Sequence, residues 1–283
     1  MKIIHISSSL LFFGITAQLS AQTELSVQSN VRPYNLDIVS PVMQAGSDAD
    51  SAQFQADVLP DMLSFIDANL SESQSVSNLS TISLDPSKLY LHNDASVRIY
   101  FLGEGAGYHN TLGFNTEGGS VDSGEPMLIF PDASSVNSYY TYGDTTTWRS
   151  KSAPLMPGDF VDLGVLEAGT QLDFFLIANG AYGGSLVWST DTSVNVDGLV
   201  HTVSLAQDGS PYLLIGFEDL YGGGDKDYND LLFAVDIGAA NVAYLANPEP
   251  STWLIMGLFT AGVLYLARRR DPDLAYAEVG CKM

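Results

Sequence analysis

Residues 216–236 read GFEDLYGGGDKDYNDLLFAVD. Five carboxylates fall within the thirteen residues from Glu218 to Asp230, and Lys226 is the one cation among them. A glycine run at 222–224 lies in the middle, and apolar runs at 212–217 and 231–237 flank the acidic stretch. Because short apolar runs bounded by turn residues are typical of β-strands, the pattern predicts two strands joined by an acidic loop.

The acidic loop is a candidate cation site. Crowded like charges repel one another, and the repulsion grows where water is excluded. A divalent cation would remove this cost, and we favour Ca²⁺ because it accepts about six to eight oxygen ligands in irregular geometry. The candidate ligands are Glu218, Asp219, Asp225, Asp227, Asn229 and Asp230.

The spacing within the loop leaves two interpretations. Asp225, Asp227 and Asn229 alternate, so a locally extended loop would present their oxygens on one side, as a metal site requires. The alternative is a solvated acidic turn, in which Asp and Asn side chains accept hydrogen bonds from their own backbone and glycine supplies positive φ.

Residues 82–238 carry the pattern of a β domain. Leu89 and Leu91, then Val97, Ile99 and Phe101, alternate with polar or amphipathic residues across a turn-like segment. Further strands are expected at 127–130, 138–142, 160–166, 172–178, 185–189, 200–206, 212–217 and 231–237. About ten short strands at this spacing predict a mainly β fold, an antiparallel β-sandwich or jelly-roll-like domain, with no helix between 82 and 238.

A short helical region is expected before the β domain. Apolar residues there recur at intervals of three and four: Phe54, Val58, Met62, Phe65, Ile66 and Leu70. Pro60 lies inside this pattern, so the helix is expected either to begin near Pro60 or to kink there. We favour packing of this apolar stripe on the β domain over binding to a partner protein.

The acidic loop and two upstream segments resemble a known family. GFEDLYGGGDKDYNDLLFAV, GEGAGYHNTLGFN (103–115) and LDFFLIANGAYGG (172–184) are similar to segments of the bacterial family called domain of unknown function 4114. The resemblance covers about residues 82–238. It implies an exported β-rich module for which calcium binding is the usual expectation and no activity is established, and it favours the calcium interpretation of the loop.

The glycine-rich segment GEGAGYHNTLGFNTEGG, residues 103–119, is a second unusual stretch. Glu104, Asn110 and Glu117 offer oxygens that would contact the acidic loop or a sugar. We favour the simpler interpretation, a glycine-rich connector whose aromatic rings pack in the core.

Aromatic residues are candidates for a glycan-binding platform. Tyr108, Trp148 and Trp188 are the candidate contacts, because flat rings stack on sugars and their polar tips form hydrogen bonds. The alternative is that these rings belong to the core, where aromatic residues of β-sandwiches usually lie.

Residues 254–267 form an apolar run, which is followed directly by Arg268, Arg269 and Arg270. The uninterrupted stretch from Ser251 is about 17 residues, at the short end of what spans a bilayer. Arginines on one flank only would orient a transmembrane helix with residues 22–247 outside the inner membrane. A buried core helix is the alternative.

Pro248, Glu249 and Pro250 precede this apolar run. The order of PEP, apolar span and arginine cluster resembles the PEP-CTERM sorting signal. This resemblance implies a Gram-negative bacterium, processing by an exosortase-type membrane protease, and release or attachment at the outer surface within a biofilm matrix. Such signals end just after the arginines, whereas this chain continues through residues 271–283.

The N-terminus reads as a secretory signal peptide. Lys2 supplies the positive charge, an apolar stretch follows, and LSA ends at Ala21, where we expect cleavage. A permanent N-terminal membrane anchor is the alternative.

Charge and motifs exclude several functions. The net charge is −22, from 33 acids against 11 bases, so the chain has no basic patch for nucleic acid or for an anionic membrane surface. Cys281 is the one cysteine, so no intramolecular disulfide forms. No HExxH, GxSxG, P-loop or Rossmann pattern occurs, and paired carboxylates of a hydrolase have no diagnostic value in so acidic a chain.

These features predict an exported, non-enzymatic cell-surface or extracellular-matrix protein with a calcium-binding β domain. An exopolysaccharide-binding module is the alternative, and a secreted hydrolase is the least favoured. The expected organisation is a signal peptide (1–21), a polar linker with an amphipathic helix (22–80), the β domain (81–240), a sorting and transmembrane segment (247–270) and a cytoplasmic tail (271–283).

Overall fold

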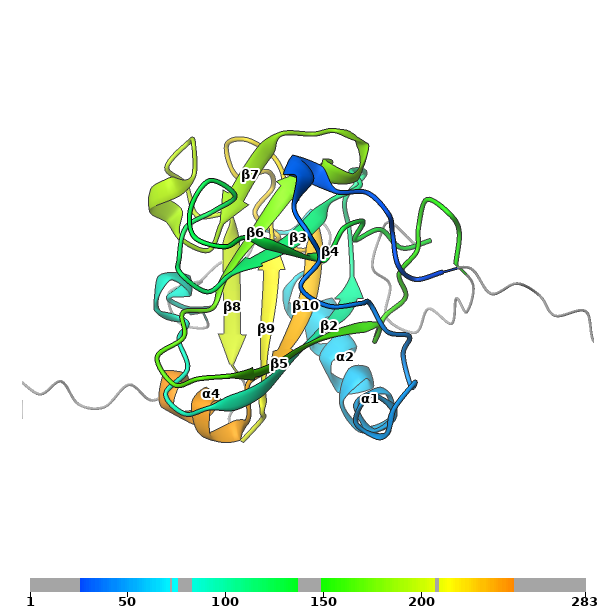
Figure 1. Cartoon of the computed structure of the whole chain (residues 1–283), viewed down its shortest axis with the longest axis vertical. Helices are drawn as coiled ribbons and strands as arrows, with labels where there is room; N and C mark the ends of the chain where they lie inside the picture. Colours follow the sequence, from blue (N-terminus) through cyan, green and yellow to red (C-terminus); the bar gives the residue numbers. More distant parts are fainter. Residues whose placement is uncertain (1–25, 72, 76–82, 137–148, 207–208, 247–283) are drawn as a thin grey trace, which may run out of the picture.

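The computed structural model describes residues 26–71, 73–75, 83–136, 149–206 and 209–246 (Figure 1). Its named strands form two antiparallel sheets. The six-stranded sheet contains, in order, β1 (Ser83–Leu84), β8 (Thr202–Ala206), β9 (Tyr212–Phe217), β10 (Leu231–Asp236), β2 (Ala95–Gly103) and β5 (Phe160–Leu166). The four-stranded sheet contains β4 (Met127–Phe130), β3 (Thr111–Asn115), β6 (Asp173–Ala178) and β7 (Leu186–Ser189). The prediction of a mainly β, antiparallel, sandwich-like fold is confirmed.

The main core lies between the two sheets. Along β10, Leu231, Phe233 and Val235 point into it, while the intervening residues face the other side of the sheet, as the two-residue period of a strand requires. Phe174 of β6 meets Phe233 edge to face, with ring centroids 5.1 Å apart. Aromatic contacts of this kind join one sheet to the other and bury the centre of the molecule.

The predicted helical region covers the outer face of the six-stranded sheet. It comprises α1 (Ala49–Gln53), the π-helical turn η2 (Phe54–Val58) and α2 (Leu59–Asn69). Phe54 stacks on Tyr100 of β2, with ring centroids 3.8 Å apart and planes at 8°. Ile66 and Leu70 are buried in the same cluster, so most of the apolar stripe packs on the β domain as favoured from the sequence, whereas Phe65 is 42% exposed.

Pro60 explains the irregular middle of this helix. A proline inside a helix lacks an N–H, and its ring clashes with the carbonyl four residues earlier. The backbone accommodates it with the wider π turn, in which the Leu59 N–H bonds to the Phe54 carbonyl, and α2 then begins with Pro60 in its first turn. The structure therefore contains both expected features: α2 begins next to Pro60, and the helix is locally distorted just before it.

The interpretation of residues 103–119 as a connector is wrong in its middle. Residues 111–115 form β3, which pairs with both β4 and β6 and is buried throughout. Gly113 lets the ring of Phe175 lie across the strand, because a Cβ at that position would sit 2.0 Å from the ring. A glycine in a strand often marks such a close approach.

Helix α4 (Ala239–Ala246) follows β10 directly and was not expected from the sequence. Its buried Asn241 accepts hydrogen bonds from the backbone N–H groups of His92 and Asn93, at 2.9 and 2.8 Å. Since β9 and β10 are antiparallel, α4 lies at one end of the sheet and the loop between these strands lies at the other (Figure 1). Among the described residues, the other helical segments are 3₁₀ turns: η1 (Pro33–Asn35), η3 (Pro86–Lys88), η4 (Gly180–Tyr182) and η5 (Thr192–Val194).

Several predictions fall on residues that the structure does not describe. These are the signal peptide at 1–21, the strand at 138–142, Trp148, and the sorting signal, transmembrane span and tail at 247–283. Within the part of the chain that is described, no helix combines the length and apolar character needed to cross a membrane.

Candidate metal centre

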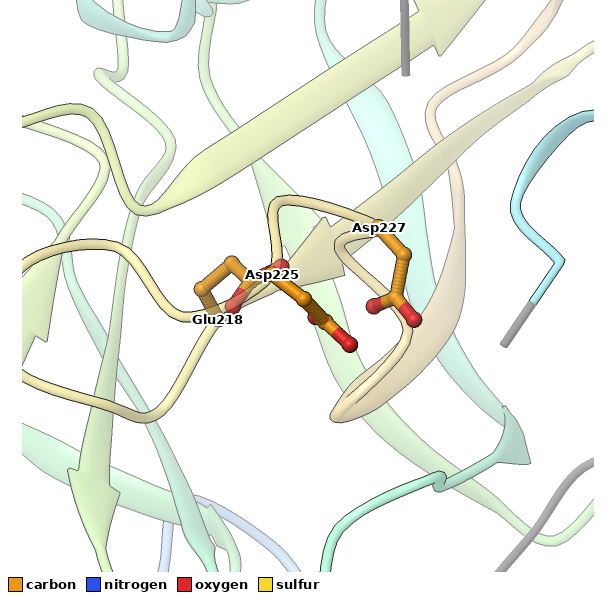
Figure 2. Close-up of side chains that lie close together, drawn as sticks. All are labelled: Glu218, Asp225 and Asp227. Carbon is orange, nitrogen blue, oxygen red and sulfur yellow. The ribbon is translucent and has the colours of Figure 1, made fainter. Parts of the chain in front are cut away.

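The acidic loop joins β9 to β10 at the edge of the sandwich. Leu231 pairs with Phe217, so Glu218 at the end of one strand lies near the residues that begin the other. Gly222, Gly223 and Gly224 all have positive φ, which lets the loop reverse direction within a few residues. Figure 2 shows the acidic side chains Glu218, Asp225 and Asp227 beside the strand ends.

The loop is coiled rather than extended. Lys226 and Tyr228 have φ values of 65° and 57°, in the left-handed region that side chains other than glycine rarely adopt. These two residues interrupt the alternation expected for Asp225, Asp227 and Asn229. The extended arrangement inferred from the spacing is therefore wrong, although the loop still gathers acidic side chains.

Three of the six predicted ligands converge. Glu218, Asp225 and Asp227 each offer a carboxylate oxygen, and these oxygens lie within 4.8 Å of one another (Figure 2). Glu218 and Asp227 are buried, whereas Asp225 is exposed at the rim. Hard cations such as Ca²⁺ are bound by clusters of carboxylate oxygens with water in the remaining positions.

Glu218 is the buried centre of this group, with an exposed fraction of 1%. Its Oε1 accepts a hydrogen bond from the Tyr228 N–H at 2.9 Å, but its Oε2 is buried without a hydrogen-bond partner. Burial raises the pKa of Glu218 to about 7, and the charges of Asp227 and Asp225 act in the same direction. A Cβ on residue 224 would stand 2.0 Å from Oε2, so glycine is needed there.

Asp227 is held in place by donors on both sides. Its Oδ2 accepts hydrogen bonds from the Ser73 N–H at 2.7 Å and from Nδ2 of Asn229 at 3.0 Å. The same Nδ2 donates to the carbonyl of Leu70 at 3.2 Å. Asn229 therefore links Asp227 to the end of α2 through its amide nitrogen.

A buried histidine supports the loop from the other side. His201 Nε2 lies 3.0 Å from Oδ2 of Asp197, and that oxygen also accepts a hydrogen bond from the Gly222 N–H at 2.9 Å. The His201 ring stacks on Trp188, with centroids 3.8 Å apart. His201 therefore has a structural role, and Asp197, which it contacts, fixes the glycine turn in place.

Asp219 and Asp230 form a second, separate pair. Consecutive residues at a strand end point to opposite sides, so Asp219 turns away from Glu218. The Asp219 N–H donates to Oδ2 of Asp230 at 2.8 Å, and Nδ2 of Asn110 donates to Oδ2 of Asp219 at 2.8 Å. Burial and then the charge of Asp219 raise the pKa of Asp230 to about 8. The five predicted carboxylate ligands therefore do not all fall in one group.

The segment 103–119 contacts the acidic loop. This contact was the less favoured of the two interpretations of the sequence. Besides the bond from Asn110, the Gly105 N–H donates to the carbonyl of Asn229 at 2.9 Å. Glu104 lies beside these contacts with an exposed fraction of 4%. Glu117, the third oxygen donor considered there, is exposed.

The candidate glycan contacts lie in different environments. Tyr108 is 43% exposed, so its ring is available at the surface. Trp188 is fully buried, and its Nε1 donates to the carbonyl of Asp219 at 2.8 Å. Trp188 therefore packs in the core, as the alternative interpretation expected, and cannot present its ring to a glycan.

Comparison with known proteins matches part of the chain to a protein family. No curated protein and no solved structure matches the chain. Residues 166–238 match the model of the family described as "Domain of unknown function (DUF4114)". This stretch contains β6 to β10 and the whole acidic loop. The resemblance stated for residues 82–238 is thus confirmed for its C-terminal part, residues 166–238.

Proposed function

We propose that this chain is an exported, non-enzymatic cell-surface or extracellular-matrix protein whose β domain is stabilised by calcium. Glu218, Asp225 and Asp227 would hold the ion. The observation that carries the proposal is the buried Oε2 of Glu218, which has no hydrogen-bond partner and lies in a group with two further carboxylates. A buried polar atom without a partner is costly unless a ligand satisfies it.

Either a proton or a calcium ion would remove the cost of burying the negative charge of Glu218. Burial raises the pKa of Glu218 only to about 7, so a proton is largely lost in mildly alkaline surroundings. Three carboxylates supply up to half a dozen oxygens, enough for most of a calcium shell. Extracellular calcium modules bind with dissociation constants of about 0.1–1 mM, which suits a site of this size with one exposed ligand.

The position of the loop supports a role at the cell surface. The loop lies at the end of the sheet opposite to α4, which leads to residues 247–270 (Figure 1). In a chain anchored through that segment, the calcium loop would face away from the membrane. An ion there would stabilise the end of the domain that is most exposed to the surroundings.

Sorting by the C-terminal signal is part of the same proposal. Pro248, Glu249 and Pro250 would be recognised by an exosortase-type protease, with Arg268–Arg270 on the cytoplasmic side of the inner membrane. Mass spectrometry of the native protein from cell envelope and medium tests this directly. Chains that end near Pro250 are expected in the surface or medium fraction, and full-length chains in every fraction would contradict processing.

Thermal unfolding of the full chain tests the calcium site. A ligand that binds only the folded state stabilises it, by about 2.7 kcal/mol at one hundred times its dissociation constant. We expect the melting temperature to rise between chelator and millimolar calcium, and the rise to be lost in Asp225→Asn, whose exposed side chain leaves the core untouched. Asp122→Asn, an exposed residue outside the group, is the matched control. An equal shift in both variants would contradict the site.

Binding of exopolysaccharide is the second candidate function. Tyr108 and Tyr182 are 43% and 61% exposed, and their loops are joined by a hydrogen bond from the Ala181 N–H to the carbonyl of His109. Two exposed rings on adjoining loops are the kind of surface that stacks on sugars. Retention of the protein on the host's polysaccharide, lost on Tyr108→Ala together with Tyr182→Ala, would favour this function.

A further inference from the structure

Strand β7 has one edge that no other named strand covers. It is an outermost strand of the four-stranded sheet, where it pairs only with β6 (Figure 1). The Thr190 N–H, directly after the strand, donates to the carbonyl of Phe174 in β6 at 3.0 Å. Because alternate residues of an antiparallel strand turn their backbone groups to opposite edges, those of Ser185, Val187 and Ser189 face the uncovered edge.

Side chains cap this edge on both sides of Val187. The Tyr34 hydroxyl donates to the carbonyl of Ser185 at 2.7 Å. The side-chain amide of Asn195 accepts from the Ser189 N–H at 2.7 Å and donates to the Ser189 carbonyl at 3.2 Å, as the backbone of a neighbouring strand would. Within the part of the chain that the structure describes, the N–H and carbonyl of Val187 have no such partner.

A groove of about 460 Å³ borders the opening at Val187. Its apolar lining consists of Tyr34, Val121, Leu186, Val187, Val194 and Val196. Four of these side chains are exposed, and Val196 has the largest exposed fraction, 69%. Exposed apolar side chains beside an uncovered strand edge are typical of a surface that accepts a further strand.

The chemistry of the groove favours a peptide over a sugar or a lipid chain. Sugars are bound by aromatic rings and several polar side chains, whereas most of this lining is aliphatic. A hydrocarbon chain would leave the N–H and carbonyl of Val187 without a partner, at a cost in free energy. An extended peptide satisfies both groups with its own backbone and places alternate side chains against the valines.

The charge of the groove favours a basic occupant. Asp122 is exposed and is the one charged residue among the described residues that line the groove. The whole chain has a net charge of −22, so a second copy would approach this edge against strong repulsion. A peptide with lysine or arginine at its ends is instead attracted to the groove.

We propose that the uncovered edge of β7 binds an extended, basic segment of a partner protein, which adds a strand to the four-stranded sheet next to β7. Val187 supplies the backbone hydrogen bonds, the groove accepts the apolar side chains, and Asp122 pairs with a cationic end. This binding site goes beyond the proposed function and does not depend on the calcium loop between β9 and β10.

Peptide binding to the full chain tests the proposal. The probe is a fluorescent peptide of alternating valine and threonine, about six residues long as strands usually are, with a lysine at each end. Fluorescence polarisation should show saturable binding below about 1 mM peptide. The same peptide with glutamate ends should bind more weakly, and the peptide N-methylated at every residue should not bind, because it has no N–H to donate.

Two variants address the edge and the charge separately. Val187→Pro removes the outward N–H, which proline permits on an edge strand, and should weaken binding about tenfold, the effect of one lost hydrogen bond. Asp122→Lys, at an exposed position, should reverse the preference for lysine over glutamate ends and serves in case Val187→Pro does not fold. Glu167→Lys, an exposed change after β5, is the matched control and should bind like wild type. Asp225→Asn should also bind like wild type, so failure of the calcium site leaves this test intact.

Several results would overturn the inference. These are no saturation up to about 1 mM of the lysine-ended peptide, equal affinity in wild type and folded Val187→Pro, and equal binding of the N-methylated peptide, which would show apolar contact without an added strand. Analytical ultracentrifugation tests the alternative occupant. A wild-type dimer that becomes monomeric in Val187→Pro would show that a second copy covers β7 and would overturn the choice of a partner peptide.

Discussion

The backbone N–H of Ser73 donates a hydrogen bond to Oδ2 of Asp227 at 2.7 Å, across 154 residues of sequence. This bond connects the segment after α2 to the acidic loop. Ser75 makes a further short contact with the carbonyl of Asp225. The helical region that covers the outer face of the sheet is thus attached to the same loop that gathers the candidate calcium ligands.

Removal of the Asn229 side chain should weaken the attachment of the helical region to the acidic loop. Its Nδ2 donates both to Asp227 and to the carbonyl of Leu70, and both acceptors are left without this donor in Asn229→Ala. We expect a loss of about 1–3 kcal/mol of unfolding free energy and weaker calcium binding. Denaturant unfolding measures the first and calorimetric titration the second. Asn69→Ala, which removes an exposed amide near the end of α2, should change both far less.

Two glycines of the loop should respond differently to alanine. In Gly224→Ala the new Cβ would meet Oε2 of Glu218 at 2.0 Å, so the carboxylate must move and the calcium-dependent rise in melting temperature should disappear. Gly222→Ala has no atom within 4 Å of the new Cβ. It carries only the cost of positive φ, about 1–2 kcal/mol, and should keep the calcium response. A full response in Gly224→Ala would show that Glu218 is not a ligand.

Gly113 should be intolerant of any side chain. A Cβ in the middle of β3 would sit 2.0 Å from the ring of Phe175, which would have to leave its place. Overpacking of this kind costs about 1–3 kcal/mol, so Gly113→Ala should lower the denaturant midpoint markedly. Gly107→Ala is the control, because no atom lies within 4 Å of its new Cβ. Similar midpoints for the two variants would contradict the position assigned to β3.

Without calcium, stability should fall as the pH rises from about 5 to 9. Burial raises the pKa of Glu218 to about 7, of Asp230 to about 8 and of Glu104 to about 9. The folded state therefore binds more protons than the unfolded state across this range, and ionisation at higher pH destabilises the fold. Melting temperatures in chelator should decrease with pH, and calcium should reduce the slope. A chelator curve that rises towards pH 9 would contradict protonation of these groups.

The strands that flank the acidic loop could be predicted from the sequence. Residues 212–217 form β9 as expected, and β10 ends one residue before the predicted position. Their apolar runs are bounded by glycine and acidic residues, so propensity and patterning agree. By contrast, β3 was missed because Gly113 and the neighbouring glycines read as a connector. Gly113 lies in a strand because it pairs with Phe175, more than sixty residues later, and leaves room for the Phe175 ring.

The acidic cluster could be found from the sequence. Its division into the group of Glu218, Asp225 and Asp227 and the pair of Asp219 and Asp230 could not. Spacing grouped six ligands, whereas the alternation at the end of β9 separates Glu218 from Asp219. The left-handed conformations of Lys226 and Tyr228 carry no sequence signal comparable to a glycine. The hydrogen bond from Asn110, which precedes β3, to Asp219, which follows β9, joins the ends of strands from both sheets, a tertiary relationship that local patterns do not contain.

A crystal structure of the protein grown with calcium tests the central claim most directly. Anomalous scattering should reveal an ion bound by Glu218, Asp225 and Asp227, with Oε2 of Glu218 as a ligand. The contradicting result is the same crystal with no anomalous peak in the loop and the three carboxylates turned apart into solvent.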